Sequence, residues 1–436
     1  MKGLKRYLYQ SYIVVINSIA FYPTLISFGF LLFSFISMSL EYKTFMNEFK
    51  KEIAIVLVNG EDNARLILGT IVGSMISLMV FSFSMVMLVL GRASATLSPR
   101  VLPGLITQKS HQVVLGVYLG TIIHSLILII NMQSAQADYQ VPSLGVLFAM
   151  IFTIFCLALF VYFIHSISKT IQTDSILKTI FTNTLYHMEN LEEDTSGNKP
   201  DIDDWISIET PLSGYLKQVN TKDLTKICQK EDIQIAITVH IGYFMVENYP
   251  FVKVNKDIDK ELKENILQCF IFFPEEHVSD HYIFGFKQVS EIAIKALSPG
   301  INDPGTAVKA LDFLSILFIR RMELSDHSSC RDEEGTLRIS FREPTVKELL
   351  YLNLTQIRHY GCTDSVVMYN LLQSLKNIIY ADKQNCQIGV LSNYVKSVVD
   401  SCDRHIQNSL DRGQLNIIIE RINDLLKDSD KLALLK

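Results

Sequence analysis

The sequence predicts a membrane α-helical protein, in which four transmembrane helices are followed by a cytoplasmic α+β region: a small β-rich module plus a helical domain. The first observation is that long uncharged apolar stretches are confined to residues 1–164 of the 436. A helix needs about 20 apolar residues to cross the hydrocarbon layer. Four stretches reach that length, at about residues 19–40, 66–90, 113–132 and 144–164. The second observation is that later segments alternate between strand and helix periodicity.

The charges of the short loops predict the orientation of the spans, because cytoplasmic loops are enriched in Lys and Arg. Basic residues precede the first span and follow the second and the fourth, namely Lys2, Lys5, Arg6, Arg92, Arg100, Lys109, Lys169 and Lys178. The only charged residue of the loop 133–143 is Asp138. We therefore expect the N-terminus and the C-terminal domain to be cytoplasmic.

Changes in periodicity and composition divide the chain. Helical periodicity continues from the fourth span through residues 165–193, and the polar, turn-rich stretch 192–201 is typical of a linker. The predicted segments are a transmembrane domain (1–165), a cytoplasmic helix and linker (166–201), a β-rich module (202–256) and a mainly helical cytoplasmic domain (257–436).

Local patterns predict the elements of the cytoplasmic region. Alternating apolar residues from Ile233 to Val239 indicate a half-buried strand, and 221–230 reads as a short helix capped by Asn220 or Thr221. In the last domain we expect helices at 258–272, 282–297, 304–322, 343–360, 364–381, 388–410 and 415–427, a polar loop at 326–336 and a short strand at 337–342.

Charge and cysteine usage exclude some classes of protein. Residues 1–165 contain ten basic and six acidic residues, a net charge of +4, whereas the rest contains 30 basic and 39 acidic residues, a net charge of −9. Nucleic-acid binding requires a basic surface, so no nucleic-acid partner is expected. The seven cysteines are scattered without a C-x-x-C pair, which argues against a disulfide framework or a zinc site and favours a reducing compartment.

The second span has a polar face. At about 100° per residue, one narrow arc of this helix contains Thr70, Ser74, Ser77, Phe81 and Ser84. One interpretation is a hydroxyl-lined pore in which Phe81 forms a hydrophobic constriction. The other is close helix packing, because Gly69-x-x-x-Gly73-x-x-x-Ser77 is a small-residue interface motif. Both interpretations hold if second spans from several subunits pack around a shared axis.

Two further features concern the membrane. His124 lies in the middle of the third span, where an ionisable residue either faces a polar path or forms hydrogen bonds with a neighbouring helix. Arg92 and Arg100 follow the second span and suit either a cytoplasmic mouth that attracts anions or contact with anionic lipid head groups. Ordinary anchoring on the cytoplasmic side also accounts for both arginines.

The most distinctive motif of the soluble region is 296–307, ALSPGINDPGTA. Pro304 suits the first position of a helix and Asp303 its N-cap, so the motif predicts a turn between two helices. A ligand or cation site at this joint is the alternative. The residues concerned are Ser298, Pro299, Asn302, Asp303, Pro304 and Thr306.

Evidence for catalysis is sparse. Glu275, Glu276, His277, Asp280 and His281 crowd together, but they lack a third well-spaced ligand, so no metal site is predicted. No P-loop, dinucleotide fingerprint, zincin motif or nucleophile elbow occurs, and no cofactor is expected.

The segment 284–307, FGFKQVSEIAIKALSPGINDPGTA, resembles the signature of a bacterial family of predicted membrane proteins, the domain of unknown function 2254. Ser98-Pro99-Arg100 and the block 213–216 are similar to other recurrent parts of that family, and the resemblance covers nearly the whole chain. It implies location in the bacterial inner (plasma) membrane but no established activity. Gly305 departs from the family pattern, which usually has a bulky aromatic residue there.

Two functional hypotheses follow. The first is an oligomeric channel or transport protein, a homo-oligomer in the lipid bilayer whose second span lines the path above a cytoplasmic vestibule. The second is a non-enzymatic membrane sensor or scaffold, whose cytoplasmic domain binds a small ligand or a protein partner. An enzyme is the least favoured reading. The ion, solute or ligand is not specified by the sequence.

Overall fold

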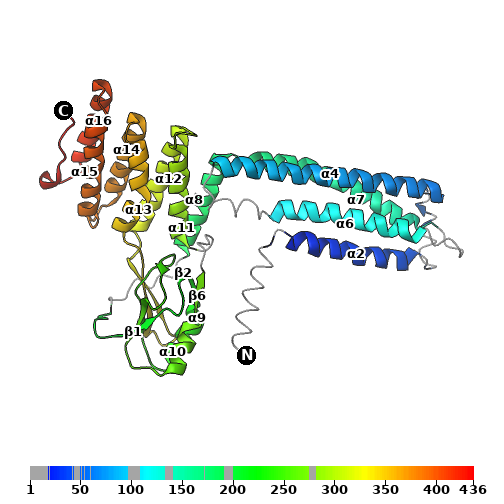
Figure 1. The fold of residues 1–436 in the computed structure, drawn as a ribbon, viewed down its shortest axis with the longest axis horizontal. Helices are drawn as coiled ribbons and strands as arrows, with labels where there is room; N and C mark the ends of the chain where they lie inside the picture. Colours follow the sequence, from blue (N-terminus) through cyan, green and yellow to red (C-terminus); the bar gives the residue numbers. More distant parts are fainter. Residues whose placement is uncertain are drawn as a thin grey trace. The chain divides into compact units, whose positions relative to one another are not determined.

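A computed structural model describes residues 18, 20–41, 43, 50, 52–53, 55–58, 60–96, 109–132, 141–170, 172–190, 200–273 and 281–436. Two compact units are present. We call them the four-helix unit, which contains the apolar helices, and the mixed unit, which contains the remaining helices and all strands of the described residues. Figure 1 shows both units as ribbons.

The four-helix unit confirms the four predicted spans. Its helices are α2 (Phe21–Glu41), α4 (Glu61–Thr96), α6 (Lys109–Met132) and α7 (Ser143–Thr170). All four are long and apolar enough to cross a membrane. The helix expected to continue from the fourth span is two elements, because α8 begins separately at Thr173 and ends at Glu189.

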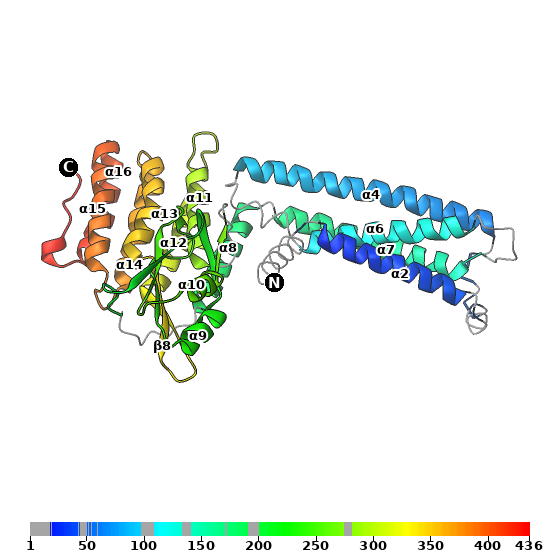
Figure 2. The same ribbon diagram turned by 60° about the horizontal axis from the view of Figure 1, so that its bottom comes forward.

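Small residues on α6 allow α2 to pack closely against it. A Cβ on Gly120 would lie 2.5 Å from the ring of Phe30, and a Cβ on Gly116 would lie 3.0 Å from the Cα of Pro23. Gly116-x-x-x-Gly120 is therefore a small-residue interface within the chain. Its two helices run side by side in Figure 2.

The buried carboxylate of Glu41 ties the end of α2 to the start of α7. Glu41 is 1% exposed and lies 2.7 Å from the Nζ of Lys50. The same carboxylate accepts a hydrogen bond from the N–H of Leu144 at 3.2 Å. A carboxylate suits this place, because the first N–H groups of a helix lack partners within the helix and carry partial positive charge.

The mixed unit contains two sheets. One has the order β1-β5-β3-β8-β7 and the other β4-β2-β6. The strands are β1 (Ile206–Glu209), β2 (Gly214–Val219), β3 (Ile235–Ile237), β4 (Phe244–Met245), β5 (Pro250–Val254), β6 (Phe270–Phe273), β7 (His327–Arg331) and β8 (Leu337–Arg342). Strands β3 and β8 pair in parallel, and the other pairs are antiparallel.

Two expectations about this region are wrong. The predicted loop at 326–336 contains β7, because the hairpin partner β8 supplies hydrogen bonds to a polar strand. The predicted helix at 258–272 is shorter: α10 (Lys260–Leu267) ends and the chain enters β6. The sheets therefore use strands from far beyond residue 256, and their common core includes Phe251, Phe270 and Ile339.

Short helices and a stack of longer ones complete the unit (Figure 1). Besides α8 they are α9 (Thr221–Lys230), α11 (Tyr282–Ala296), α12 (Pro304–Met322), α13 (Val346–Gly361), α14 (Ser365–Ala381), α15 (Ile388–His405) and α16 (Ser409–Asn423). Helix α11 packs on α8, α12 and α13, and α14 packs on α12, α15 and α16. The expected helix 388–410 is too long, since α15 ends at His405 and α16 begins at Ser409.

Candidate functional site

The predicted polar arc lies on the exposed surface of α4. The side chains of Thr70, Ser74, Ser77, Phe81 and Ser84 are all exposed. Three hydroxyls donate hydrogen bonds to carbonyls of their own helix: Thr70 to Leu66 at 2.7 Å, Ser74 to Thr70 at 2.6 Å and Ser77 to Gly73 at 3.0 Å. Each oxygen keeps acceptor capacity for a group outside the helix.

A different face of α4 packs within the unit. Ala64, Leu68, Ile71 and Met75 join the buried cluster that includes Val114 and Tyr118 of α6. At about 100° per residue, the centre of this face lies roughly 120° around the helix from the polar arc. Nothing among the described residues lies within 4 Å of a Cβ built on Gly69 or Gly73. The small-residue motif of α4 therefore does not serve packing within the described four-helix unit.

His124 is buried between three helices. Its Nδ1 lies 2.7 Å from the Oγ of Ser34 on α2, and its Nε2 lies 3.3 Å from the carbonyl oxygen of Gly145 on α7. The rings of Phe33 and Phe152 lie beside the imidazole, each with its centroid 5.6 Å away. A neutral imidazole that donates from Nε2 and accepts at Nδ1 satisfies this site. A role of His124 in a polar path through the membrane stays a prediction.

Arg92 has an exposed side chain on the last turns of α4, and Arg100 lies outside the described residues. The predicted linker and the residues Glu275, Glu276, His277 and Asp280 also fall largely or wholly outside them. The roles proposed for these residues stay predictions.

The 296–307 motif forms the predicted joint between α11 and α12. Asp303 caps α12, accepting from the N–H of Thr306 at 3.2 Å and from its hydroxyl at 2.6 Å, and Pro304 is the first helical residue. Ser298 donates to the carbonyl of Lys295 at 2.6 Å. Asn302 adopts a positive φ of 50°, which asparagine tolerates better than most residues. Pro299, Asn302 and Asp303 are exposed. Capping thus explains Asp303 and Pro304, and ligand binding stays a prediction.

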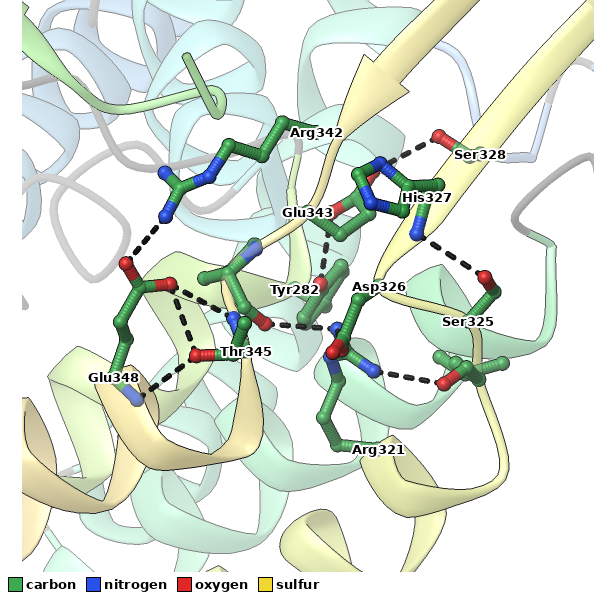
Figure 3. Close-up of polar contacts among 12 residues, drawn as sticks. Tyr282, Arg321, Ser325, Asp326, His327, Ser328, Arg342, Glu343, Thr345 and Glu348 are labelled. Carbon is green, nitrogen blue, oxygen red and sulfur yellow. Dashed lines mark hydrogen bonds and ion pairs between the residues drawn. The ribbon is translucent and has the colours of Figure 1, made fainter. Parts of the chain in front are cut away.

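A second polar group, missed in the sequence, lies where the sheets meet the helices. We call it the Glu343 cluster, and its members are His281, Tyr282, Arg321, Asp326, Ser328 and Glu343. Figure 3 labels every member of the cluster except His281, together with Arg342, Thr345 and Glu348. The six members of the cluster come from the N-cap and first residue of α11, the end of α12, the residue before β7, the strand β7 itself and the residue that follows β8.

Glu343 is the centre of the cluster. Its Oε2 accepts from the hydroxyl of Tyr282 at 2.9 Å, and its Oε1 accepts from Ser328 at 3.1 Å. Burial raises the pKa of the Glu343 carboxyl above its ordinary value, more than these hydrogen bonds lower it. Burial also raises the pKa of Tyr282 well above 10, so its hydroxyl stays a donor.

Arg321 joins α12 to the two segments that flank the β7–β8 hairpin. Its side chain is completely buried. It donates to the carbonyl of Leu324 at 2.9 Å, to Asp326 at 2.7 Å and to the carbonyl of Pro344 at 2.8 Å. These bonds hold the helix end and both ends of the hairpin in one arrangement.

His281 is held neutral. Its Nδ1 accepts from the N–H of Ile283 at 3.4 Å as the N-cap of α11, and its Nε2 lies 3.9 Å from Oε2 of Glu343. Burial lowers the pKa of His281 to about 3, and electrostatic interactions with His240, His187 and Arg321 act in the same direction.

A cavity of about 270 Å³ opens beside the cluster. Its lining residues belong to β3, β7 and β8 or to the segments beside them, and the polar ones are Thr238, Asp326, His327, Ser340, Arg342, Glu343 and Thr345. Arg342 forms an ion pair with Glu348, whose carboxylate also accepts from the N–H of Thr345 in the capping box of α13. A cavity with a few fixed polar groups is the usual form of a small-molecule site.

Sequence reasoning missed this cluster because its members are dispersed between residues 281 and 343. The available signal was Thr345-x-x-Glu348, a capping box that places Glu343 just before a helix. Among the residues that the structure describes, no three His, Cys, Asp or Glu side chains are arranged to hold a metal ion.

Replacing His281 by asparagine is expected to flatten the dependence of stability on pH. Below its ordinary pKa of 6.5 the unfolded chain takes up a proton that the folded protein refuses, because the folded pKa is about 3. The free energy of unfolding should therefore fall with pH below about 6.5, by up to about 1.4 kcal/mol per pH unit. Asn keeps the cap of α11. Urea unfolding of both proteins at pH 7.5, 6.5 and 5.5, followed by the single tryptophan, Trp205, measures the difference.

An equal pH dependence in both proteins would contradict the neutral, buried state of His281. Glu343→Gln is the opposite control. The raised pKa of Glu343 makes its charged form unfavourable in the folded protein, so wild-type stability gains as pH falls through that pKa, and the Gln variant should lack this gain.

Four helices of membrane-spanning length followed by a mixed helical and sheet region define a polytopic membrane protein. The family model described as "Predicted membrane protein (DUF2254)" matches residues 16–377, and the chain belongs to this family. Uncharacterized proteins of Mycobacterium bovis and Mycobacterium tuberculosis (strain H37Rv) are each 24% identical over 391 residues, which covers 85% of this chain and 74% of theirs. No solved structure matches the chain.

Proposed function

We propose that this protein is a homo-oligomeric channel or transport protein of the bacterial inner membrane, in which the polar arc of α4 from each subunit lines a shared path. The N-terminus and the mixed unit lie in the cytoplasm. The basic residues that flank the first, second and fourth spans support this orientation.

The observation that carries the proposal is the exposed polar arc itself. Lipid offers no hydrogen-bond partner to the oxygens of Thr70, Ser74 and Ser77, although their protons are bonded within the helix. Gly69 and Gly73 leave open space beside them. Small residues with hydroxyl groups favour close contact with another helix or with water, so a second subunit or an aqueous path is the natural neighbour.

The chain uses another glycine motif for its own packing. Gly116 and Gly120 already accommodate α2. The motif of α4 is therefore available for contacts between subunits. Phe81, 48% exposed on the same arc, would narrow the path as a hydrophobic constriction.

Cysteines placed on the arc should cross-link between subunits and react with aqueous reagents. We expect Ser74→Cys and Ser77→Cys to form dimers with a short bifunctional thiol reagent. Ile154→Cys, exposed on α7, should not. Purified protein in liposomes should conduct ions or small solutes, and Phe81→Ala should raise that flux several-fold by removing the constriction.

The proposal fails if liposomes show no flux under changes of voltage, tension and pH while Ser74→Cys and Ile154→Cys react alike. Cross-linking without flux would support the homo-oligomer but contradict the channel function.

A second candidate function, a ligand sensor or scaffold, is favoured by the cavity beside the Glu343 cluster. Its lining carries donors, acceptors and both signs of charge. A thermal-shift screen of metabolites and nucleotides against the wild type and Arg342→Ala tests it. A ligand that stabilises only the wild type supports the sensor, and no stabilisation by any compound counts against it.

A further inference from the structure

Two asparagines of α16 hold the backbone of residues 431–436. The side-chain amide of Asn416 donates to the carbonyl of Leu435 at 3.0 Å and accepts from the N–H of Leu435 at 2.8 Å. Asn423 makes the same pair of bonds with Leu432, at 3.0 and 2.8 Å. Each side chain thus satisfies both polar groups of one peptide residue (segment in red, Figure 1).

The spacing of these bonds matches a helix to an extended chain. Asn416 and Asn423 are seven residues apart, which is about 10.5 Å along an α-helix. Leu432 and Leu435 are three residues apart, which is about 10 Å along an extended chain. The later asparagine binds the earlier leucine, so the bound segment runs antiparallel to α16.

The burial of the side chains in this segment follows the same three-residue spacing. Leu435 is buried and Leu432 is half-buried, whereas Ala433 and Leu434 are exposed. The asparagines bind only main-chain groups. The burial of Leu435 and the partial burial of Leu432 add a preference for apolar side chains at these two positions. At the start of the segment, Lys431 forms an ion pair with Asp428. Recognition therefore depends on an extended backbone with apolar side chains three residues apart.

We propose that the Asn416–Asn423 face of α16 is a peptide-binding surface and that residues 431–436 are its tethered occupant. The partner that fits is an extended protein segment with apolar side chains three residues apart. It competes with residues 431–436 and binds once they are displaced. A tethered segment is present at an effective concentration near the millimolar range, so it blocks weaker partners and admits stronger ones.

A labelled, end-blocked peptide of residues 425–436 tests the proposal in trans. Fluorescence anisotropy compares its binding to the purified full chain and to a chain that lacks residues 428–436. We expect binding to the shortened chain and at least tenfold weaker binding to the full chain, whose surface is occupied. The shortened chain carrying Asn416→Leu and Asn423→Leu should not bind, whereas Asn393→Leu, an exposed asparagine of α15, should leave binding unchanged.

N-methylated peptides distinguish hydrogen bonding to the peptide backbone from non-specific binding, and they leave the protein unaltered. Methylation of the Leu435 nitrogen removes a bonded N–H and should weaken binding about tenfold. Methylation at Ala433, for whose N–H the structure records no partner among the described residues, should have little effect. Equal binding of the two peptides would overturn the proposal, as would the absence of binding to a shortened chain that retains its helical circular dichroism.

Hydrogen exchange on the full chain covers the case in which the shortened chain does not fold. The amides of Leu432 and Leu435 should be protected, and Asn416→Leu/Asn423→Leu should abolish this protection while that of β3 persists. Fast exchange at both leucines in the wild type would overturn the proposal.

Discussion

Replacing Arg321 by methionine is expected to destabilise the mixed unit by about 3 kcal/mol or more. The substitution removes three donors from a fully buried place and leaves the carbonyls of Leu324 and Pro344 without them. A loss of that size is a large part of the 5–15 kcal/mol that typically stabilises a domain. Urea unfolding followed by Trp205 fluorescence should show a markedly lower midpoint.

The neighbouring Arg320 is the matched control. Its side chain is half-buried and pairs with Glu323, three residues further along the chain. Surface pairs of this kind contribute little, so Arg320→Met should change the free energy of unfolding by no more than about 0.5 kcal/mol. Similar losses for both variants would show that the buried network around Arg321 does not hold helix α12 and the hairpin together.

Replacing Gly120 by valine is expected to disrupt the four-helix unit. Its Cβ would lie 2.5 Å from the ring of Phe30, and that ring is held at 5.0 Å from Phe152, so it has little freedom to move away. Helix α2 must then separate from α6, at a cost of about 1–3 kcal/mol or more. The change should appear as a lower temperature of aggregation in detergent and as a smaller yield of monodisperse protein.

Gly73→Val provides the comparison on α4. Nothing among the described residues lies within 4 Å of a Cβ there, so the subunit should fold normally. If α4 contacts another subunit, the valine should weaken cross-linking of Ser77→Cys without lowering the aggregation temperature. Equal destabilisation by both valines would contradict the assignment of the two glycine motifs to different interfaces.

The start of α12 was predictable, because the chemistry that starts a helix is local. Asp303 followed by Pro304 predicted a start that the structure confirms, and α12 extends over the residues expected. The four spans were predictable for a similar reason, since a hydrocarbon layer demands a length that can be counted along the chain.

Strands made of polar residues were not predictable. His327–Arg331 has the composition of a loop, and it becomes β7 only because β8 offers it hydrogen-bond partners. The chain from Phe270 to Phe273 continues a helical pattern, yet it pairs with β2. In both places, contacts with a distant or facing strand outweigh local preference.

The amino-acid sequence by itself determined the four helices of membrane-spanning length, the caps of α9 and α12 and a polar arc on α4, because each depends on residues within a few turns of one another. Only the tertiary structure decided which glycine motif packs within the subunit, left the arc exposed, and gathered His281, Tyr282 and Ser328 around the carboxyl of Glu343. Those outcomes depend on which surfaces meet across tens of residues, and burial, not spacing, sets the charge states that result.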